Sequence, residues 1–244
     1  GDLDGAADGQ APRLRIALIA TGSVASVKVP ELAAALCREV ASEVAVVLTA
    51  PAEVMAGRVA RRYAPDAVLD EFEQLLSSGR VRMLTDVDEW EAYEDVAEDA
   101  VVHIELRRWA DAILVAPCSA NTLAKTALGL ADNLATSLLR AWDPEKPVVV
   151  APAMNTLMWE HPTTAQHLRT LESWGYRIVP PASKRLACGD VGRGALAPVP
   201  EVVEALRAAA VEFRARYGCG PRDGAGAWAR LGFGEWAPAQ STSS

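Results

Sequence analysis

The sequence is short of lysine, of paired cysteines and of clustered positive charge. Four of its 24 basic residues are lysines, the basic residues form no extended run, and the net charge is -8. Because a nucleic-acid ligand requires a basic face, this composition excludes nucleic acid as a partner. The four cysteines include no Cys-x-x-Cys pair, so we predict neither a metal site nor a disulfide framework.

Long apolar stretches are also missing. The strongest apolar run, 110–117, is too short to cross a bilayer, and we expect no membrane partner. Residues 1–12 lack the basic start and apolar stretch of a secretion signal and are expected to form a disordered leader. The Gly- and Ala-rich stretch 218–244 is expected to be an unstructured tail. These features leave one domain at 13–217, in a protein that we expect in the cytoplasm.

Apolar runs alternate with helical patterns along the chain. Each run ends at or just before a Thr or Pro, as expected for strands buried on both faces; the runs are 14–20, 43–48, 110–116, 147–150 and 176–179. Helical spacing occupies 24–38, 121–140, 163–174 and 201–214. This alternation predicts a single α/β domain with a doubly wound parallel sheet of the flavodoxin or Rossmann type. Residues 184–200, rich in glycine and without apolar periodicity, are predicted to form a mobile loop.

Ligands of such sheets bind beyond the carboxyl ends of the strands. The segments that follow the predicted strands are 21–24, Thr49, 117–122 and 151–155. Two of them place hydroxyls and backbone amides at helix N-termini, an arrangement that holds a monophosphate without lysine. The sequence lacks G-x-G-x-x-G, which favours a mononucleotide such as FMN over NAD. The alternative is that Ser23 and Ser119 are ordinary helix N-caps.

Few residues of the sequence offer acid–base or thiol chemistry. His103 precedes a core strand and is either structural or a base that deprotonates a thiol. His161 and His167 are interpreted as surface or capping residues. Cys188 lies in the predicted loop and is expected to be the reactive thiol, whereas Cys37 and Cys118 lie in apolar segments and are expected to be buried.

Together, these motifs resemble one protein family. They are Gly22-Ser23-Val24-Ala25, the segment 103–109, Ser119-Ala120-Asn121-Thr122, the segment 152–159 (PAMNTLMW) and Ala187-Cys188-Gly189-Asp190. Over 13–209 the sequence resembles the homo-oligomeric flavin-containing cysteine decarboxylases, which include phosphopantothenoylcysteine decarboxylases and peptidyl-cysteine decarboxylases. The resemblance implies FMN as cofactor and a trimer or dodecamer with sites between subunits.

The resemblance also implies roles for individual residues. It implies His103 as catalytic base, Asn155 as the group that grips the substrate carboxylate, and Cys188 as the group that returns a proton to an enethiol intermediate. It implies FMN contacts from Gly22, Ser23, Val24, Thr49, Ser119, Ala120, Asn121, Thr122, Ala153 and Met154. Substrate contacts are implied for Asn155, Arg108, Arg185, Ala187 and Leu196. The implied chemistry oxidises the cysteine side chain to a thioaldehyde, from which CO2 can leave.

Two substrates are compatible with the resemblance. The family's substrate clamp usually reads Gly-Ala-Met-Ala-Glu-Pro, whereas here Leu196 replaces the Met and Pro198 replaces the acid. Bacterial coenzyme A enzymes are also usually fused to a synthetase domain, for which 244 residues leave no room. We therefore favour a peptide with a C-terminal cysteine as substrate, with phosphopantothenoylcysteine as the alternative. A further alternative is a non-catalytic flavoprotein that regulates a phosphatase.

Overall fold

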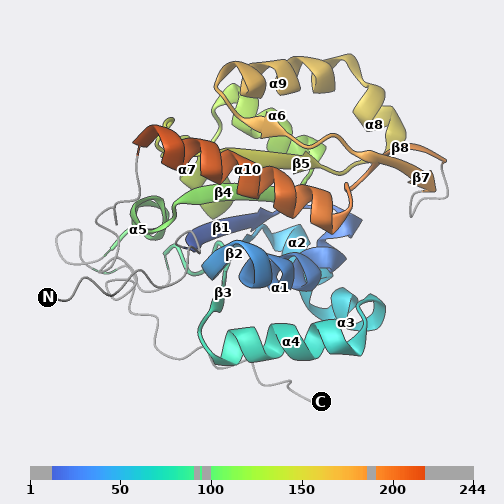
Figure 1. Cartoon of the computed structure of the whole chain (residues 1–244). Coiled ribbons are helices and arrows are strands. Elements are labelled where there is room, and N and C mark those ends of the chain that lie inside the picture. Colours follow the sequence, from blue (N-terminus) through green and yellow to red (C-terminus); the bar gives the residue numbers. More distant parts are fainter. Residues whose placement is uncertain (1–12, 91–93, 95–99, 186–190, 218–244) are drawn as a thin grey trace, which may run out of the picture.

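A computed structural model of the chain describes residues 13–90, 94, 100–185 and 191–217. Its centre is a six-stranded parallel sheet with the strand order β3-β2-β1-β4-β5-β6 (Figure 1). The strands are β1 (Leu14–Ala20), β2 (Ala41–Leu48), β3 (Val81–Leu84), β4 (Ala112–Cys118), β5 (Val148–Pro152) and β6 (Arg177–Ile178). The strand order reverses between β1 and β4. The prediction of a doubly wound α/β fold is confirmed.

Helices cover both faces of the sheet because alternate residues of each strand point to opposite sides. In β1, Leu18 packs with α1 (Val29–Glu39), α4 (Asp66–Ser77) and α10 (Val199–Tyr217). Its neighbour Ile19 packs with residues of the helices on the other face, which are α5 (Val102–Trp109), α6 (Ala120–Leu128), α7 (Leu134–Arg140) and α9 (Pro162–Ser173). Short helical segments complete the chain: η1 (Val24–Lys28), α2 (Ala50–Val54), η2 (Met55–Val59), α3 (Ala60–Tyr63) and α8 (Thr156–Glu160).

The structure corrects two of the predicted segments. The helical stretch at 121–140 is two helices, because Gly129 ends α6 with φ of 73° and Asn133 begins α7 with a capping box. The predicted loop at 184–200 instead contains an antiparallel hairpin of β7 (Ala182–Arg185) and β8 (Val191–Ala195). Backbone hydrogen bonds between the two strands hold this hairpin. A prediction based on the pattern of apolar side chains therefore did not find it.

The leader at 1–12 and the tail at 218–244 lie outside the described residues. Within the described part of the chain, no helix is both long and apolar enough to cross a bilayer. The cytoplasmic location and the domain boundaries stay predictions.

Candidate functional site

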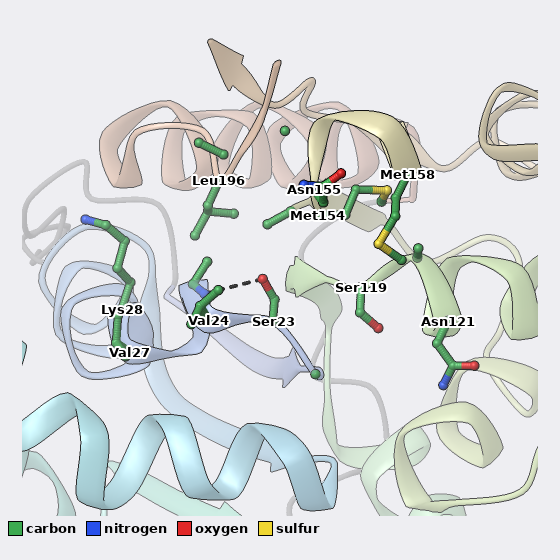
Figure 2. A pocket seen from close by; sticks show the side chains of 16 residues that line it. Ser23, Val24, Val27, Lys28, Ser119, Asn121, Met154, Asn155, Met158 and Leu196 are labelled. Carbon is green, nitrogen blue, oxygen red and sulfur yellow. Dashed lines mark hydrogen bonds between the residues drawn. The ribbon is translucent and has the colours of Figure 1, made fainter. Parts of the chain in front are cut away.

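A cavity of about 520 Å³ opens at the carboxyl ends of β1, β4 and β5 (Figure 2). It lies where the strand order reverses, which is the usual ligand site of open α/β sheets. Ten residues of the predicted site line it: Gly22, Ser23, Val24, Ser119, Ala120, Asn121, Ala153, Met154, Asn155 and Leu196. Segments far apart in the sequence are thus brought together as predicted.

Thr21 joins the two loops that form the floor of this cavity. Its buried hydroxyl accepts a hydrogen bond from the backbone N–H of Ser119 at 2.7 Å and donates one to the carbonyl of Pro117 at 3.0 Å. Ser23 and Ser119 then begin η1 and α6, where their hydroxyls accept from the N–H groups of Ala25 and Thr122. Both serines are therefore N-caps, and both also line the cavity.

Thr49 and Thr122 are buried and are not among the residues that line the cavity. Thr122 is buried under Ser119, whose hydroxyl it contacts at 3.2 Å. The Thr49 hydroxyl is buried at the end of β2 and has no hydrogen-bond partner within the described part of the chain. The Thr49 N–H donates to the carbonyl of Ala20 at 3.2 Å, so Thr49 lies beside the end of β1. A buried hydroxyl without a partner is a group that a phosphate oxygen can satisfy.

The hairpin reaches the cavity through β8. The carbonyl of Gly194 accepts a hydrogen bond of 2.9 Å from the N–H of Met154. Gly194 has φ of 149°, and a Cβ atom there would lie 2.3 Å from the carbonyl oxygen of Met154. Only glycine permits this close approach. Asn155 lies beside it and caps α8 by accepting from the N–H of Leu157 at 2.9 Å.

His103 and Arg108 are not among the residues that line the cavity. His103 is near the start of α5, and its ring Nδ1 lies 2.5 Å from Oε1 of Glu89. Arg108 pairs with the buried Glu105 one turn along the same helix. The structure therefore does not bring these two predicted residues into the lining of the cavity.

Two of the cysteines are buried, as the sequence indicated. Cys37 and Cys118 are buried, and burial raises the pKa of both thiols, that of Cys118 to about 12. Both are therefore protonated and inert at neutral pH. Cys188 and Ala187, like the side chain of Arg185, lie outside the described residues, so their assigned roles stay predictions. His161 is the N-cap of α9, which confirms its interpretation as a capping residue.

Sequence reasoning assigned no individual role to several residues that matter to the site. Lys28, Met158 and Gly194 line the cavity. Thr21 connects the loops and Glu89 contacts His103. The period of the helical pattern could have revealed Lys28, since it follows Val24 by four residues, one helical turn. No local pattern signals Thr21 or Glu89, because their partners are distant in the sequence.

Comparison with known proteins agrees with this geometry. The flavoprotein family profile matches residues 5–211, which is most of the chain. This chain is a member of the flavoprotein family. The phosphopantothenoylcysteine decarboxylase of Mus musculus is 44% identical over 80% of this chain and 87% of its own length. The enzyme of the same name from Oryza sativa subsp. japonica is 46% identical over 78% of this chain and 77% of its own length.

Solved structures of flavoprotein relatives share the fold. A variant of PPC decarboxylase in complex with pantothenoylaminoethenethiol has a TM-score of 0.68 and 41% identity, covering 81% of this chain and 98% of its own. The FMN-binding protein AtHal3 has a TM-score of 0.67 and 42% identity, with 81% and 96% covered. The FMN-dependent cysteine decarboxylase SpaF has a TM-score of 0.59 and 29% identity, with 81% and 97% covered. The predicted family and the FMN cofactor are confirmed.

Proposed function

We propose that this flavoprotein is an FMN-dependent decarboxylase of phosphopantothenoylcysteine. The observation that carries the proposal is the identity of 44% and 46% to two relatives named for that activity, against 29% to the cysteine decarboxylase SpaF. The general prediction of an enzyme that decarboxylates a cysteine is confirmed by these relatives. The preference for a peptide substrate is not supported. Phosphopantothenoylcysteine, the alternative in the sequence analysis, becomes the preferred substrate.

The residues around the cavity fit FMN. The backbone amides after Thr21 and the unpartnered Thr49 hydroxyl suit a phosphate, and the lining near Ser119 and Met154 suits a flat ring. When bound there, FMN supplies the electron acceptor that a cysteine carboxylate lacks. The Thr21–Ser119 hydrogen bond holds the two binding loops in register.

The protein's own side chains bind the substrate and move its protons. Asn155 lines the cavity, and its Oδ1 accepts the Leu157 N–H at 2.9 Å, which fixes the side chain at the start of α8; we assign its amide to the substrate carboxylate. His103 removes the thiol proton. Cys188 would supply the proton when the decarboxylated product is reduced, and the reaction is redox-neutral overall if the two electrons taken up by the cofactor are returned in that step. Leu196, 4% exposed, covers the cavity at the base of the hairpin.

Lys28 supports a phosphorylated substrate. Among the sixteen described residues that line the cavity, Lys28 alone carries a charge. Its ammonium pairs with Glu31 at 2.9 Å, and both side chains are more than one-third exposed, so an incoming phosphate can replace that partner at little cost. Figure 2 shows Lys28 at the end of the pocket opposite Asn121. We assign Lys28 to the phosphate of the substrate, the end remote from the cysteine.

The separation of His103 from the cavity supports an assembly in which subunits share sites. His103 and Arg108 then reach the cavity of a neighbouring subunit, while Asn155 acts in its own. A trimer, alone or as part of a dodecamer, is the proposed state. In a chain that acted alone, the base His103 would lie outside the cavity in which Asn155 binds the substrate carboxylate.

Steady-state kinetics test the substrate. The purified yellow protein is given phosphopantothenoylcysteine and, separately, a short peptide that ends in cysteine. We expect kcat/KM to be higher for phosphopantothenoylcysteine. A higher value for the peptide would overturn the substrate assignment and leave the decarboxylase chemistry in place, whereas no turnover of either would overturn both.

A further inference from the structure

Glu89 contacts His103 through both oxygens of its carboxylate. Oε1 lies 2.5 Å from ring Nδ1 of His103, and Oε2 accepts the backbone N–H of the same residue at 3.2 Å. The Glu89 side chain is 3% exposed, whereas that of His103 is 21% exposed. A buried carboxylate thus faces one side of a ring whose other side is open in part.

This contact fixes which ring nitrogen carries the proton. Oε2 accepts from a backbone N–H, and a carboxylate only accepts, so Nδ1 must be the donor to Oε1. Neutral His103 is therefore the Nδ1–H tautomer, and Nε2 holds the lone pair that can accept a proton. Within the described residues, no hydrogen bond to Nε2 competes for that lone pair.

His161 shows the opposite arrangement in the same chain. Its Nδ1 lies 3.3 Å from the backbone nitrogen of Thr163 and 2.8 Å from the Thr163 hydroxyl, and acceptance of the backbone N–H favours the proton on Nε2. We therefore expect the two histidines to differ in tautomer, because the Nδ1 of His103 faces a carboxylate and the Nδ1 of His161 faces a backbone N–H. His161 is an internal reference for any measurement made on His103.

The loop that carries Glu89 is itself ordered by hydrogen bonds. Asp88 accepts from the N–H and the hydroxyl of Thr85 at 2.6 and 2.8 Å, directly after β3. Trp90 N–H donates to Val87 at 3.2 Å and closes the turn. Glu89 is therefore directed from the end of β3 to the start of α5, where no N-cap side chain satisfies the helix.

We propose that Glu89 is a positioning residue for His103, holding it in the Nδ1–H tautomer so that Nε2 accepts the substrate thiol proton. The proposal rests on the proposed function. Glu89 touches no reacting atom and acts only through the ring. A competing role is purely structural, in which Glu89 is a side-chain cap for α5.

Glu89→Gln separates the two roles. The glutamine carbonyl can still accept the His103 N–H and cap α5, but its NH2 group donates to Nδ1 and forces the proton to Nε2. We expect kcat to fall roughly 10-fold or more, within the ~10²–10⁴-fold that a positioned base supplies, with KM and flavin content unchanged. Glu89→Asp keeps a carboxylate and is expected to recover part of kcat.

Asp86→Asn is the matched control. Asp86 lies in the same loop and accepts the N–H of Leu134 at the start of α7 at 3.0 Å, without a histidine partner. We expect this substitution to change kcat by less than about 2-fold, because it alters only a cap.

Nitrogen-15 NMR of the histidine rings measures the tautomer directly. The chain has three histidines, so the His103 signals are assigned by comparison with His161→Gln and His167→Gln. We expect the proton of His103 on Nδ1 in the wild type and on Nε2 in Glu89→Gln, with His161 unchanged.

If Glu89→Gln leaves both the tautomer of His103 and kcat as in the wild type, the proposal is wrong. If Glu89→Gln does not fold, the tautomer of His103 and kcat are measured in Glu89→Asp instead. Absence of a proton on His103 Nδ1 in Glu89→Asp would contradict the proposal. The tautomer is measured without substrate, so a failure of this proposal can be distinguished from a failure of the proposed function.

Discussion

The Thr21 hydroxyl, at the end of β1, accepts a 2.7 Å hydrogen bond from the backbone N–H of Ser119, at the end of β4. Thr21 is fully buried, so this bond has no competition from water. It fastens together the two loops that line the cavity. Cofactor binding should therefore depend on a residue that does not line the cavity.

Thr21→Val is expected to reduce flavin retention and lower the free energy of unfolding by about 1–3 kcal/mol, because the Ser119 N–H is left buried without a partner. Denaturant titration and flavin absorbance after gel filtration measure the two effects. Thr126→Val is the control, since the Thr126 hydroxyl donates only to a carbonyl of its own helix at 2.8 Å. Equal effects of the two substitutions would contradict this account of Thr21.

Gly194→Ala is expected to abolish turnover. Its methyl group would lie 2.3 Å from the Met154 carbonyl oxygen, so β8 must leave the cavity or Met154 must move. The decarboxylation rate and the flavin spectrum measure the outcome. At Gly57 a Cβ atom meets nothing within 4 Å, and Gly57→Ala should leave turnover intact. An active Gly194→Ala enzyme would show that the hairpin contact is dispensable.

Lys28→Gln is expected to lower kcat/KM for phosphopantothenoylcysteine roughly 10-fold or more, as loss of a charge-assisted hydrogen bond of about 1.5–3 kcal/mol implies. The dephosphorylated compound, pantothenoylcysteine, should be affected little. Lys125→Gln is the control, because Lys125 pairs with Asp132 and does not line the cavity. A loss that is equal for both substrates would remove the phosphate role of Lys28.

Mixed oligomers test whether sites are shared. His103→Asn and Asn155→Asp subunits, each inactive alone, are denatured together and refolded with FMN. If His103 acts in a neighbouring subunit, about a quarter of the sites in a 1:1 mixture contain both native residues, and activity returns to that share. Absence of activity, with refolded wild type active, would place both residues in one subunit.

The sheet and the place of the cavity were predictable from the sequence. Buried parallel strands are continuous apolar runs, and the run at 14–20 matches β1 (Leu14–Ala20). Because such strands bring their carboxyl ends together, Ser23, Ser119 and Asn155 were expected at one site and lie there.

The remaining features depend on contacts between distant residues. Glu89 and His103 are 14 residues apart, and Thr21 and Ser119 are 98 apart, so neither pair leaves a periodic pattern. The hairpin at 182–195 is held by backbone pairing, which side-chain hydrophobicity does not report. The break at Gly129 was visible as a glycine, but its left-handed conformation is set by the fold around it.

The most direct test of the account is the mass of the product formed by the wild-type yellow protein from phosphopantothenoylcysteine. The account predicts a product lighter by roughly 44 Da, the loss of CO2 with no net oxidation. A product lighter by roughly 46 Da would show that the enethiol is released without reduction. An unchanged substrate, under conditions in which a cysteine-ending peptide is decarboxylated, would contradict the proposed function.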